Sequence, residues 1–181
     1  MSKQQSIIIS GFGGQGIMLF GRLLAYAGMT KDLDVSWIPS YGPEMRGGTA
    51  NCTVILSDES IGSPVVADPN LVIAFNRPSV EKFIPVMQKG GICLYDSSLI
   101  TEYSVNADHV TMIPVPATEM AAELGNTKLA NMVMAGAYLA KTDFLDIDTV
   151  MAALKETLPE RRHNLLPLNN QALEAGKKLL S

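Results

Sequence analysis

The stretch that most restricts the fold is residues 6–28, SIIISGFGGQGIMLFGRLLAYAG, where a glycine-rich turn follows an apolar run. The β-branched residues 7–9 predict a buried strand, and the apolar residues after the turn recur with helical spacing over residues 15–28. The turn offers four glycines and one amide to a ligand, Gly11, Gly13, Gly14, Gln15 and Gly16. The first, second and fourth glycines have the GxGxxG spacing. The stretch therefore predicts a strand, a tight turn and a helix, the first half of a βαβ unit.

The rest of the chain alternates between strand and helix patterns and then becomes helical. Further strands are expected at 34–39, 49–56, 71–75, 91–96 and 110–116, with a helix at 79–87. Helical patterns follow at 120–124, 129–140, 147–158 and 172–180, with Asp146 as an N-cap and Pro159 as a stop. Asn169 and Asn170 are expected to start the last helix. No repeat or linker interrupts residues 1–181, so we expect one α/β domain with helices on the faces of a sheet.

A site for NAD requires more than glycines, because an acidic side chain about 20 residues later, at the end of the second strand, binds the ribose. Asp32 and Asp34 lie at that distance, but both precede the predicted strand, and Pro39 stands near its end. The adenosine half of a dinucleotide site is therefore missing. Two interpretations of the glycine turn stay open: close packing on the sheet, or an anion site at the helix N-terminus.

A second unusual segment, SYGPEMRGGTANC, spans residues 40–52. Its loop combines an aromatic ring, turn formers and an ion-pairable duo: Tyr41, Gly42, Pro43, Glu44, Arg46, Gly47 and Gly48. Loops of this kind can lie beside a glycine turn at the ends of the strands, which would make a composite site. The alternative is an ordinary tight loop with solvated charges.

Composition excludes several classes of function. The net charge is −4 and the pI is near 5.1, so the chain has no basic field for nucleic acid or an anionic membrane. Cys52 and Cys93 stand alone, whereas a structural zinc or a cubane cluster requires about four grouped ligands. No apolar run approaches the roughly 20 residues that span a bilayer. We expect a cytoplasmic protein with reduced thiols, without a metal site of its own.

Together, the segments GFGGQGIMLFGRLLAYAG and SYGPEMRGGTANCTV resemble the gamma subunit of the 2-oxoacid:ferredoxin oxidoreductases. The resemblance continues through PNLVIAFNRPSVEKF, GGICLYDSS and NTKLANMVMAGAYLAKT, so it covers nearly the whole chain in order. It implies an α/β fold, a Rossmann-like three-layer α/β/α sandwich with a helical C-terminal part.

The resemblance also implies a complex that converts a 2-oxo acid and coenzyme A (CoA) to acyl-CoA and carbon dioxide while reducing ferredoxin. In that family thiamine diphosphate, magnesium and 4Fe-4S clusters belong to partner chains, the alpha, beta and ferredoxin-like delta subunits. This chain lacks the GDG triplet of a thiamine diphosphate segment. The resemblance implies no catalytic residue in this chain, and we expect the isolated chain to be inactive.

By this interpretation the residues of the glycine turn and of the 41–48 loop face the assembled active site, where they contact CoA or complete the cavity wall. Two rival hypotheses are a free-standing oxidoreductase that binds NAD or FAD, and a scaffold module that binds no cofactor. Among substrates the resemblance favours 2-oxoglutarate, with pyruvate and branched-chain 2-oxo acids as alternatives.

The sequence also predicts the surroundings of a few other residues. Met132 and Met134 cannot share one helix face, so we expect one of them to point to a partner. Asn131 interrupts an apolar pattern and needs a hydrogen bond if it is buried. His163 is expected in a solvated loop, and Asp96 in a turn at a strand end.

Overall fold

The computed structural model describes residues 3–40 and 49–181 and contains a six-stranded sheet with the order β2-β3-β1-β4-β5-β6. The strands are β1 (Gln4–Phe12), β2 (Asp34–Ser40), β3 (Thr49–Ser57), β4 (Leu71–Ala74), β5 (Ile92–Asp96) and β6 (Thr111–Val115). Strands β2 to β6 lie within one residue of the predicted ranges, and β1 extends three residues beyond the predicted 7–9 at each end.

The sheet is mixed. Strands β1, β4, β5 and β6 run parallel, while β3 is antiparallel to both β1 and β2. Strand β2 therefore runs in the same direction as β1 but is separated from it by β3. The first βαβ unit is split by an inserted strand, which the sequence pattern does not predict because antiparallel pairing depends on contacts far apart in the chain.

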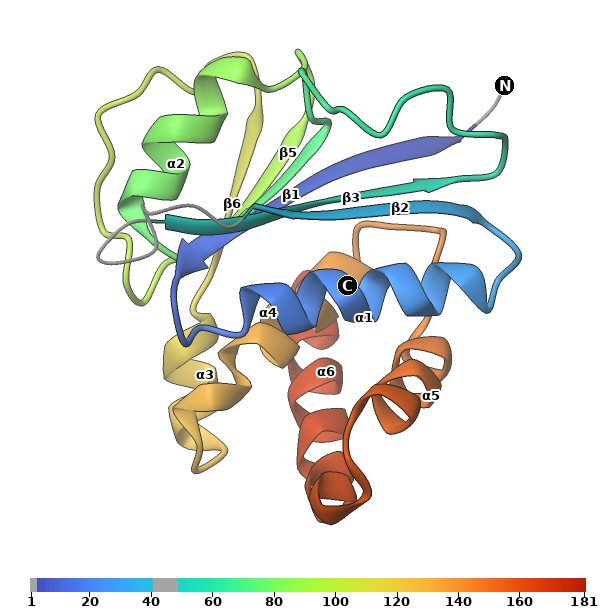
Figure 1. Ribbon diagram of the computed structural model, residues 1–181. Coiled ribbons are helices and arrows are strands. Elements are labelled where there is room, and N and C mark those ends of the chain that lie inside the picture. Colours follow the sequence, from blue (N-terminus) through green and yellow to red (C-terminus); the bar gives the residue numbers. More distant parts are fainter. Residues whose placement is uncertain (1–2, 41–48) are drawn as a thin grey trace.

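Helices cover both faces of the sheet, unequally (Figure 1). One face carries α2 (Arg77–Phe83), followed by the 3₁₀ turn η2 (Ile84–Val86). The other face carries the remaining helices: α1 (Ile17–Met29), α3 (Ala117–Glu123), α4 (Ala130–Leu139), α5 (Ile147–Thr157) and α6 (Leu166–Leu180), with the 3₁₀ turns η3 (Thr127–Leu129) and η4 (Glu160–Leu165). The predicted three-layer α/β/α sandwich with a helical C-terminal part is confirmed.

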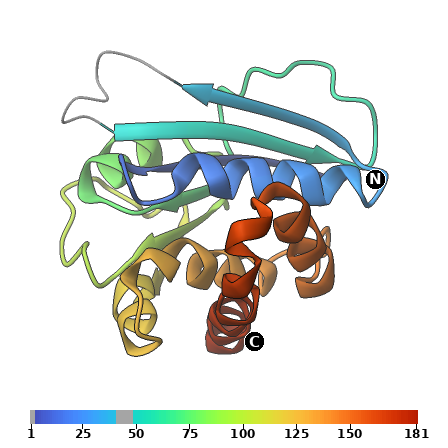
Figure 2. The same cartoon turned by 60° about the horizontal axis from the view of Figure 1, so that its bottom comes forward.

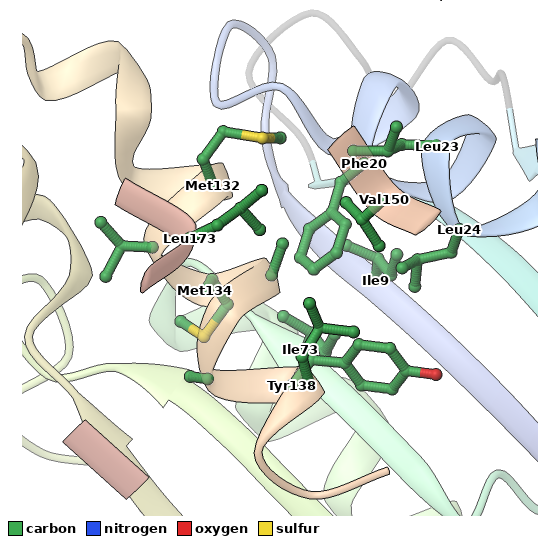
Figure 3. Close-up of a cluster of buried hydrophobic side chains, with 14 of the residues drawn as sticks. Ile9, Phe20, Leu23, Leu24, Ile73, Met132, Met134, Tyr138, Val150 and Leu173 are labelled. Carbon is green, nitrogen blue, oxygen red and sulfur yellow. The ribbon is translucent and has the colours of Figure 1, made fainter. Parts of the chain in front are cut away.

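Helix α4 is the centre of the larger core. Every residue from Ala130 to Leu139 is buried. Figure 3 shows Met132 and Met134 inside the cluster that also contains Phe20 of α1 and Leu173 of α6. The expectation that one of these methionines points to a partner is wrong, because α4 is enclosed on all sides, so both faces of the helix are core.

Helices α4 and α6 cross at unusually short range. A Cβ atom on Gly136 of α4 would meet the backbone of Leu173, and one on Gly176 of α6 would meet the backbone of Val133. Two glycines thus let the helix backbones touch, and α6 packs on α4 as the outermost element of this side (Figure 2).

One helix start agrees with the sequence prediction, and the bounds of two other helices differ from it. Asp146 caps α5 as predicted, because its Oδ1 accepts a hydrogen bond from the Thr149 N–H at 2.8 Å. Helix α6 begins at Leu166, three residues before Asn169, where the sequence places its start. Pro167 stands in the first turn, where a missing N–H costs nothing. Helix α2 covers 77–83 rather than 79–87, since Pro85 converts the last turn to 3₁₀.

Candidate functional site

The glycine turn lies at the carboxyl end of β1, and Gln15 holds it closed. The N–H of Phe12 donates to Gln15 Oε1 at 2.6 Å, and Gln15 Nε2 donates to the carbonyl of Phe75 at 3.2 Å, beyond the end of β4. Gly14 and Gly16 have φ angles of 92° and 77°, which favour glycine. Gln15 is therefore a structural clamp that ties the turn to the neighbouring strand.

Gly11 and Gly13 of the turn differ in how closely other atoms approach them. A Cβ on Gly11 would lie 2.5 Å from Gln15 Oε1 and 2.8 Å from Phe75 Cβ, so this glycine permits close packing. A Cβ on Gly13 would have nothing within 4 Å among the described residues. Packing explains Gly11, but it does not explain Gly13, which is exposed.

Helix α1 begins directly after the turn with Gly16 as its N-cap and no side-chain cap. The N–H groups of Ile17, Met18 and Leu19 form its first turn, and within the described chain no group accepts their hydrogen bonds. No acidic residue stands in that turn. This end of the helix therefore carries a partial positive charge that is available to an anion.

A hollow with a volume of about 230 Å³ opens beside this helix end. We call it the glycine shelf, and its lining residues are Gly14, Gln15, Phe75, Leu99, Thr118, Thr127, Lys128 and Ala130. None of them is acidic. Lys128 is exposed, and no acidic side chain pairs with it in the described part of the chain. The shelf thus offers the Thr127 hydroxyl and the Lys128 ammonium group, and it meets, at Gly14, a second hollow that the first turn of α1 lines with its free N–H groups. Together these donors suit a phosphate.

The far wall of the shelf is fixed by a buried carboxylate. Asp96 is fully buried at the end of β5 and accepts from the hydroxyl of Thr118 at 2.6 Å and from the Ser98 N–H at 3.1 Å. These bonds attach the start of α3 to the sheet. Asp96 begins the expected turn, and its role is to position Thr118.

The second segment of interest, Tyr41–Gly48, lies outside the described residues. Its flanking strands do place its two ends. Thr49 of β3 pairs with Phe12 of β1, and Ser40 of β2 pairs with Asn51 of β3. Both ends of the segment therefore stand at the same edge of the sheet as the glycine turn.

Comparison with known proteins decides the family. A family model described as pyruvate ferredoxin/flavodoxin oxidoreductase matches residues 6–179. This chain belongs to that family.

Relatives within the family divide into long and short chains. The chain is 40% identical over 169 residues to a ketoisovalerate oxidoreductase subunit, VorA, of Methanothermobacter thermautotrophicus, covering 93% of this chain but only 35% of VorA. It therefore spans about a third of the length of VorA. It is 32% identical to a 2-oxoglutarate synthase subunit, KorC, of the same organism, covering 98% of this chain and 95% of KorC.

Solved structures of the family show the same fold. The gamma subunit of a keto/oxoacid ferredoxin oxidoreductase from Geobacter sulfurreducens matches with a TM-score of 0.82 at 26% identity, covering 97% of this chain and 98% of that one. A 2-oxoglutarate:ferredoxin oxidoreductase from Magnetococcus marinus, with 2-oxoglutarate, coenzyme A and succinyl-CoA bound, matches with a TM-score of 0.89 at 25% identity over 98% of this chain and 31% of that chain. The resemblance to gamma subunits of this family is confirmed.

In the described part of this family chain, the split sheet does not present the ribose-binding acid of a Rossmann dinucleotide site. Ser40, not an acid, ends β2, and β3 stands between β2 and β1. A ribose-binding acid at the end of the second strand of a Rossmann site lies on the strand next to the glycine turn. Ser40 therefore has neither the carboxylate nor the position that ribose binding requires.

Thr118, Thr127 and Lys128 are shelf residues that sequence reasoning missed. They lie more than 100 residues after the glycine turn and have no motif of their own. The one available signal was Asn126, which caps η3 by accepting from the Lys128 N–H at 3.1 Å. That cap indicates a turn before α4, but the sequence does not show that this turn lies beside the glycine turn.

The two cysteines and two histidines of this family chain have structural surroundings. Cys52 and Cys93 lie in the core clusters on opposite faces of the sheet, and burial raises the pKa of their thiols to about 11 and about 12. His109 and His163 bond to backbone carbonyls, and His163 lies in η4 rather than in the expected loop. Across the described ranges no three metal-ligating side chains gather, and no helix is long and apolar enough to cross a membrane.

Proposed function

We propose that this chain, as one domain over residues 1–181, is the gamma subunit of a multisubunit 2-oxoacid:ferredoxin oxidoreductase and that its glycine shelf forms one wall of the CoA site. The observation that carries the proposal is the nearly complete mutual coverage with a gamma subunit of this family, together with the CoA-bound state of a second structural neighbour. The coverage of KorC supports the same division into subunits.

The shelf fits the anionic part of CoA. CoA carries a diphosphate and a ribose phosphate, which need donors and no carboxylate in contact with them. No acidic residue lines the shelf, and Asp96 is buried behind Thr118. The first turn of α1, in the hollow that meets the shelf at Gly14, supplies backbone N–H groups, and Lys128 supplies an exposed positive charge. Gly13 and Gly14 let a bulky phosphate approach the backbone. In the proposal Tyr41, Gly42, Pro43, Glu44, Arg46, Gly47 and Gly48 complete the wall from the neighbouring strand ends.

The reaction itself belongs to other chains in this proposal. Thiamine diphosphate with its magnesium supplies the decarboxylation chemistry, and 4Fe-4S clusters carry two electrons to ferredoxin, in alpha, beta and ferredoxin-like delta subunits. The buried, protonated thiols of this chain are unsuited to hold a cluster. Its own residues bind and orient CoA so that its thiol reaches the acyl group.

The substrate is a 2-oxo acid, with 2-oxoglutarate and ketoisovalerate as the two acids to test first. The relatives point in different directions, since VorA has the higher identity and KorC the matching length. A panel of 2-oxo acids, assayed with CoA and ferredoxin, identifies the substrate of the purified complex.

The subunit proposal is tested by anaerobic affinity purification of this chain from its native cells. We expect larger thiamine-binding chains and a cysteine-rich chain to co-purify in fixed ratio, with thiamine diphosphate and iron in the preparation. A chain that purifies alone with bound NAD or FAD contradicts the proposal and supports the dehydrogenase alternative.

The CoA proposal is tested by Lys128→Ala and Arg46→Ala in the assembled complex. Each removes one positive charge, and we expect KM for CoA to rise roughly tenfold with kcat and KM for the 2-oxo acid little changed. Lys89→Ala is the matched control, because Lys89 lines a hollow at the amino end of the strands with Gln5 and Asn70. An unchanged KM for CoA in Lys128→Ala removes the shelf from the CoA site, and an unchanged KM in Arg46→Ala removes the 41–48 segment from it.

A further inference from the structure

Helix α1, strand β2 and the turn between them form a partly exposed apolar face along the side of the molecule. The exposed residues of α1 are Arg22, Tyr26 and Met29, which follow the i, i+4, i+7 spacing and therefore lie on one side of the helix. Beside them stand three half-buried apolar residues, Leu33, Val35 and Trp37. We call these six residues the α1–β2 face. The helix runs alongside the β2–β3 pair, so the face follows the length of α1 and does not cross either end of the sheet (Figure 2).

Two glycines hold the helix against the strand. A Cβ atom on Gly21 would lie 2.8 Å from Trp37 Nε1, and one on Gly28 would lie 3.0 Å from Val35 Cγ2. The two elements therefore form one continuous surface. Strand β2 is also an edge of the sheet, and no further strand of the described chain lies beyond it. A surface fixed in this way loses little conformational entropy when it binds a partner.

The composition of the α1–β2 face differs from that of the other long helices in the same layer. A helix that faces water usually exposes charged side chains. On α5 and α6 the exposed charged residues are Asp148, Lys155, Glu156, Glu174 and Lys178. Helix α1 has one charged residue among 13, Arg22, whereas Tyr26 and Met29 are 37% and 62% exposed. Tyr, Trp, Met and Arg are enriched in protein–protein interfaces, so this face is suited to a protein partner.

Arg22 is the charged residue of this face, and within residues 3–40 and 49–181 no acidic side chain pairs with it. At the Met29 end the turn adds Lys31, which pairs with Asp146, and the exposed Asp32, and charged groups of this kind are typical of an interface rim. A guanidinium among apolar side chains pairs with a carboxylate through two parallel hydrogen bonds when the surface is covered. The face therefore selects a partner surface that is apolar and carries a carboxylate opposite Arg22.

The lengths of two relatives indicate which partner this is. The segment that matches this chain makes up 35% of VorA and 31% of the Magnetococcus marinus chain. Most of each polypeptide therefore lies outside that segment and is covalently attached to it. Where the same parts are separate subunits, as in the function proposed above, a non-covalent surface has to hold them together. A rigid, apolar face with one unpaired charge is suited to this task.

We infer that the α1–β2 face binds the subunit that corresponds to the rest of VorA. Tyr26, Met29 and Trp37 pack against an apolar surface of that subunit, and Arg22 pairs with one of its carboxylates. The inference rests on the proposed function, because it requires a complex of separate subunits. It concerns a different surface from the CoA wall, since none of the six residues lines the glycine shelf or the hollow that meets it at Gly14.

The inference is tested by photo-crosslinking in the assembled complex. Tyr26 is replaced by p-benzoyl-phenylalanine, which keeps an aromatic ring on the face, and the crosslinked chain is identified by mass spectrometry. We expect crosslinks to the chain that matches the rest of VorA. The same replacement at Lys178, which is exposed on α6, is the matched control. Crosslinks from Tyr26 only to a second copy of this chain, no crosslink from Tyr26, or equal crosslinking from both positions overturns the inference.

Substitutions on the face measure how much it contributes to assembly. Met29→Asp and Arg22→Glu each place a carboxylate there, so we expect the amount of the larger chain that co-purifies with this chain to fall at least about tenfold. Circular dichroism checks that both variants remain folded. The matched controls are Val86→Asp, at a side chain 48% exposed on the α2 side of the sheet, and Lys178→Glu, and both should co-purify as wild type does.

The same purification separates failure of this inference from failure of the proposed function. If the wild-type chain and both face variants recover the larger chain equally, the inference is overturned while the proposed function stands. If the wild-type chain recovers no larger chain, both are overturned.

Discussion

The two ends of the sheet differ in how completely their polar groups are paired. At the amino end Gln5 Oε1 accepts from the Tyr138 hydroxyl at 2.7 Å, and Asn70 both accepts from the Ser6 N–H and donates to the Gln4 carbonyl. At the carboxyl end α1 starts without a cap, and the buried Nδ2 of Asn76, just after β4, lacks a hydrogen-bond partner among the described residues. At the amino end the chain pairs its own polar groups, whereas at the carboxyl end these groups are available to a ligand or a partner chain.

Apolar side chains are exposed at both ends of the sheet, and Met29, near the amino end of the strands, is 62% exposed. Phe12 and Leu99 project at the carboxyl end, with 44% and 50% of their surfaces exposed. Ligands of open α/β sheets bind at this end of the strands. Unpaired polar groups and uncapped helix ends are expected mainly at functional sites. The difference therefore predicts that substitutions at the amino end reduce stability, whereas substitutions at the carboxyl end reduce binding.

The largest expected effect is at the amino end. Tyr138→Ala removes a fully buried ring near the C-terminus of α4 together with the hydrogen bond to Gln5. We expect the free energy of unfolding to fall by about 3–5 kcal/mol, because a cavity replaces the ring. Urea denaturation followed by circular dichroism measures it. A loss below about 1 kcal/mol would mean that α4 is not the centre of the core.

Asn70→Ala tests the pairing at the same end without making a large cavity. The variant leaves the Ser6 N–H and the Gln4 carbonyl without their partner. We expect a loss of about 1–3 kcal/mol in the free energy of unfolding and an unchanged KM for CoA in the complex. A raised KM with unchanged stability would reverse the assignment of the two ends.

Asp146 links the helical layer to α1 and predicts a pH dependence. The ion pair with Lys31 at 2.7 Å and the bonds from Thr149 hold the pKa of the Asp146 carboxyl well below its usual range. A lowered pKa in the folded state means that the stabilisation is present above the unfolded pKa of about 3.9 and is lost as the pH falls below it.

Asp146→Ala should therefore cost about 1 kcal/mol at pH 7, mostly from the lost N-cap, since the ion pair is half exposed. Urea denaturation of both proteins at several pH values should show the difference shrinking below about pH 4. A difference that stays constant down to pH 2 would contradict the cause given for the lowered pKa.

How much of this could be predicted from the sequence depends on the range of the interactions. The β1–α1 unit, the strands and the Asp146 cap follow from neighbouring residues, and they are where the patterns place them. The insertion of β3 beside β1, the burial of both Met132 and Met134, and the position of Lys128 on the shelf depend on contacts between distant segments. The start of α6 was misplaced because the polar Asn169 and Asn170 resemble a helix start, while Leu166 and Leu168 pack against the core.

The sharpest test compares two glycines of one turn, and one of the two variants has the smallest expected effect on stability. Gly11→Ala forces a methyl group against Gln15 and Phe75, so we expect it to lower the free energy of unfolding by about 1–3 kcal/mol. Gly13→Ala adds the same methyl group where the described structure leaves open space, so stability should stay within about 0.5 kcal/mol of wild type. If the turn only packs on the sheet, Gly13→Ala is silent in every assay of the complex. If the turn contacts CoA, the variant raises KM for CoA while the protein remains as stable as wild type, and this separates the two explanations that the GxGxxG spacing leaves open.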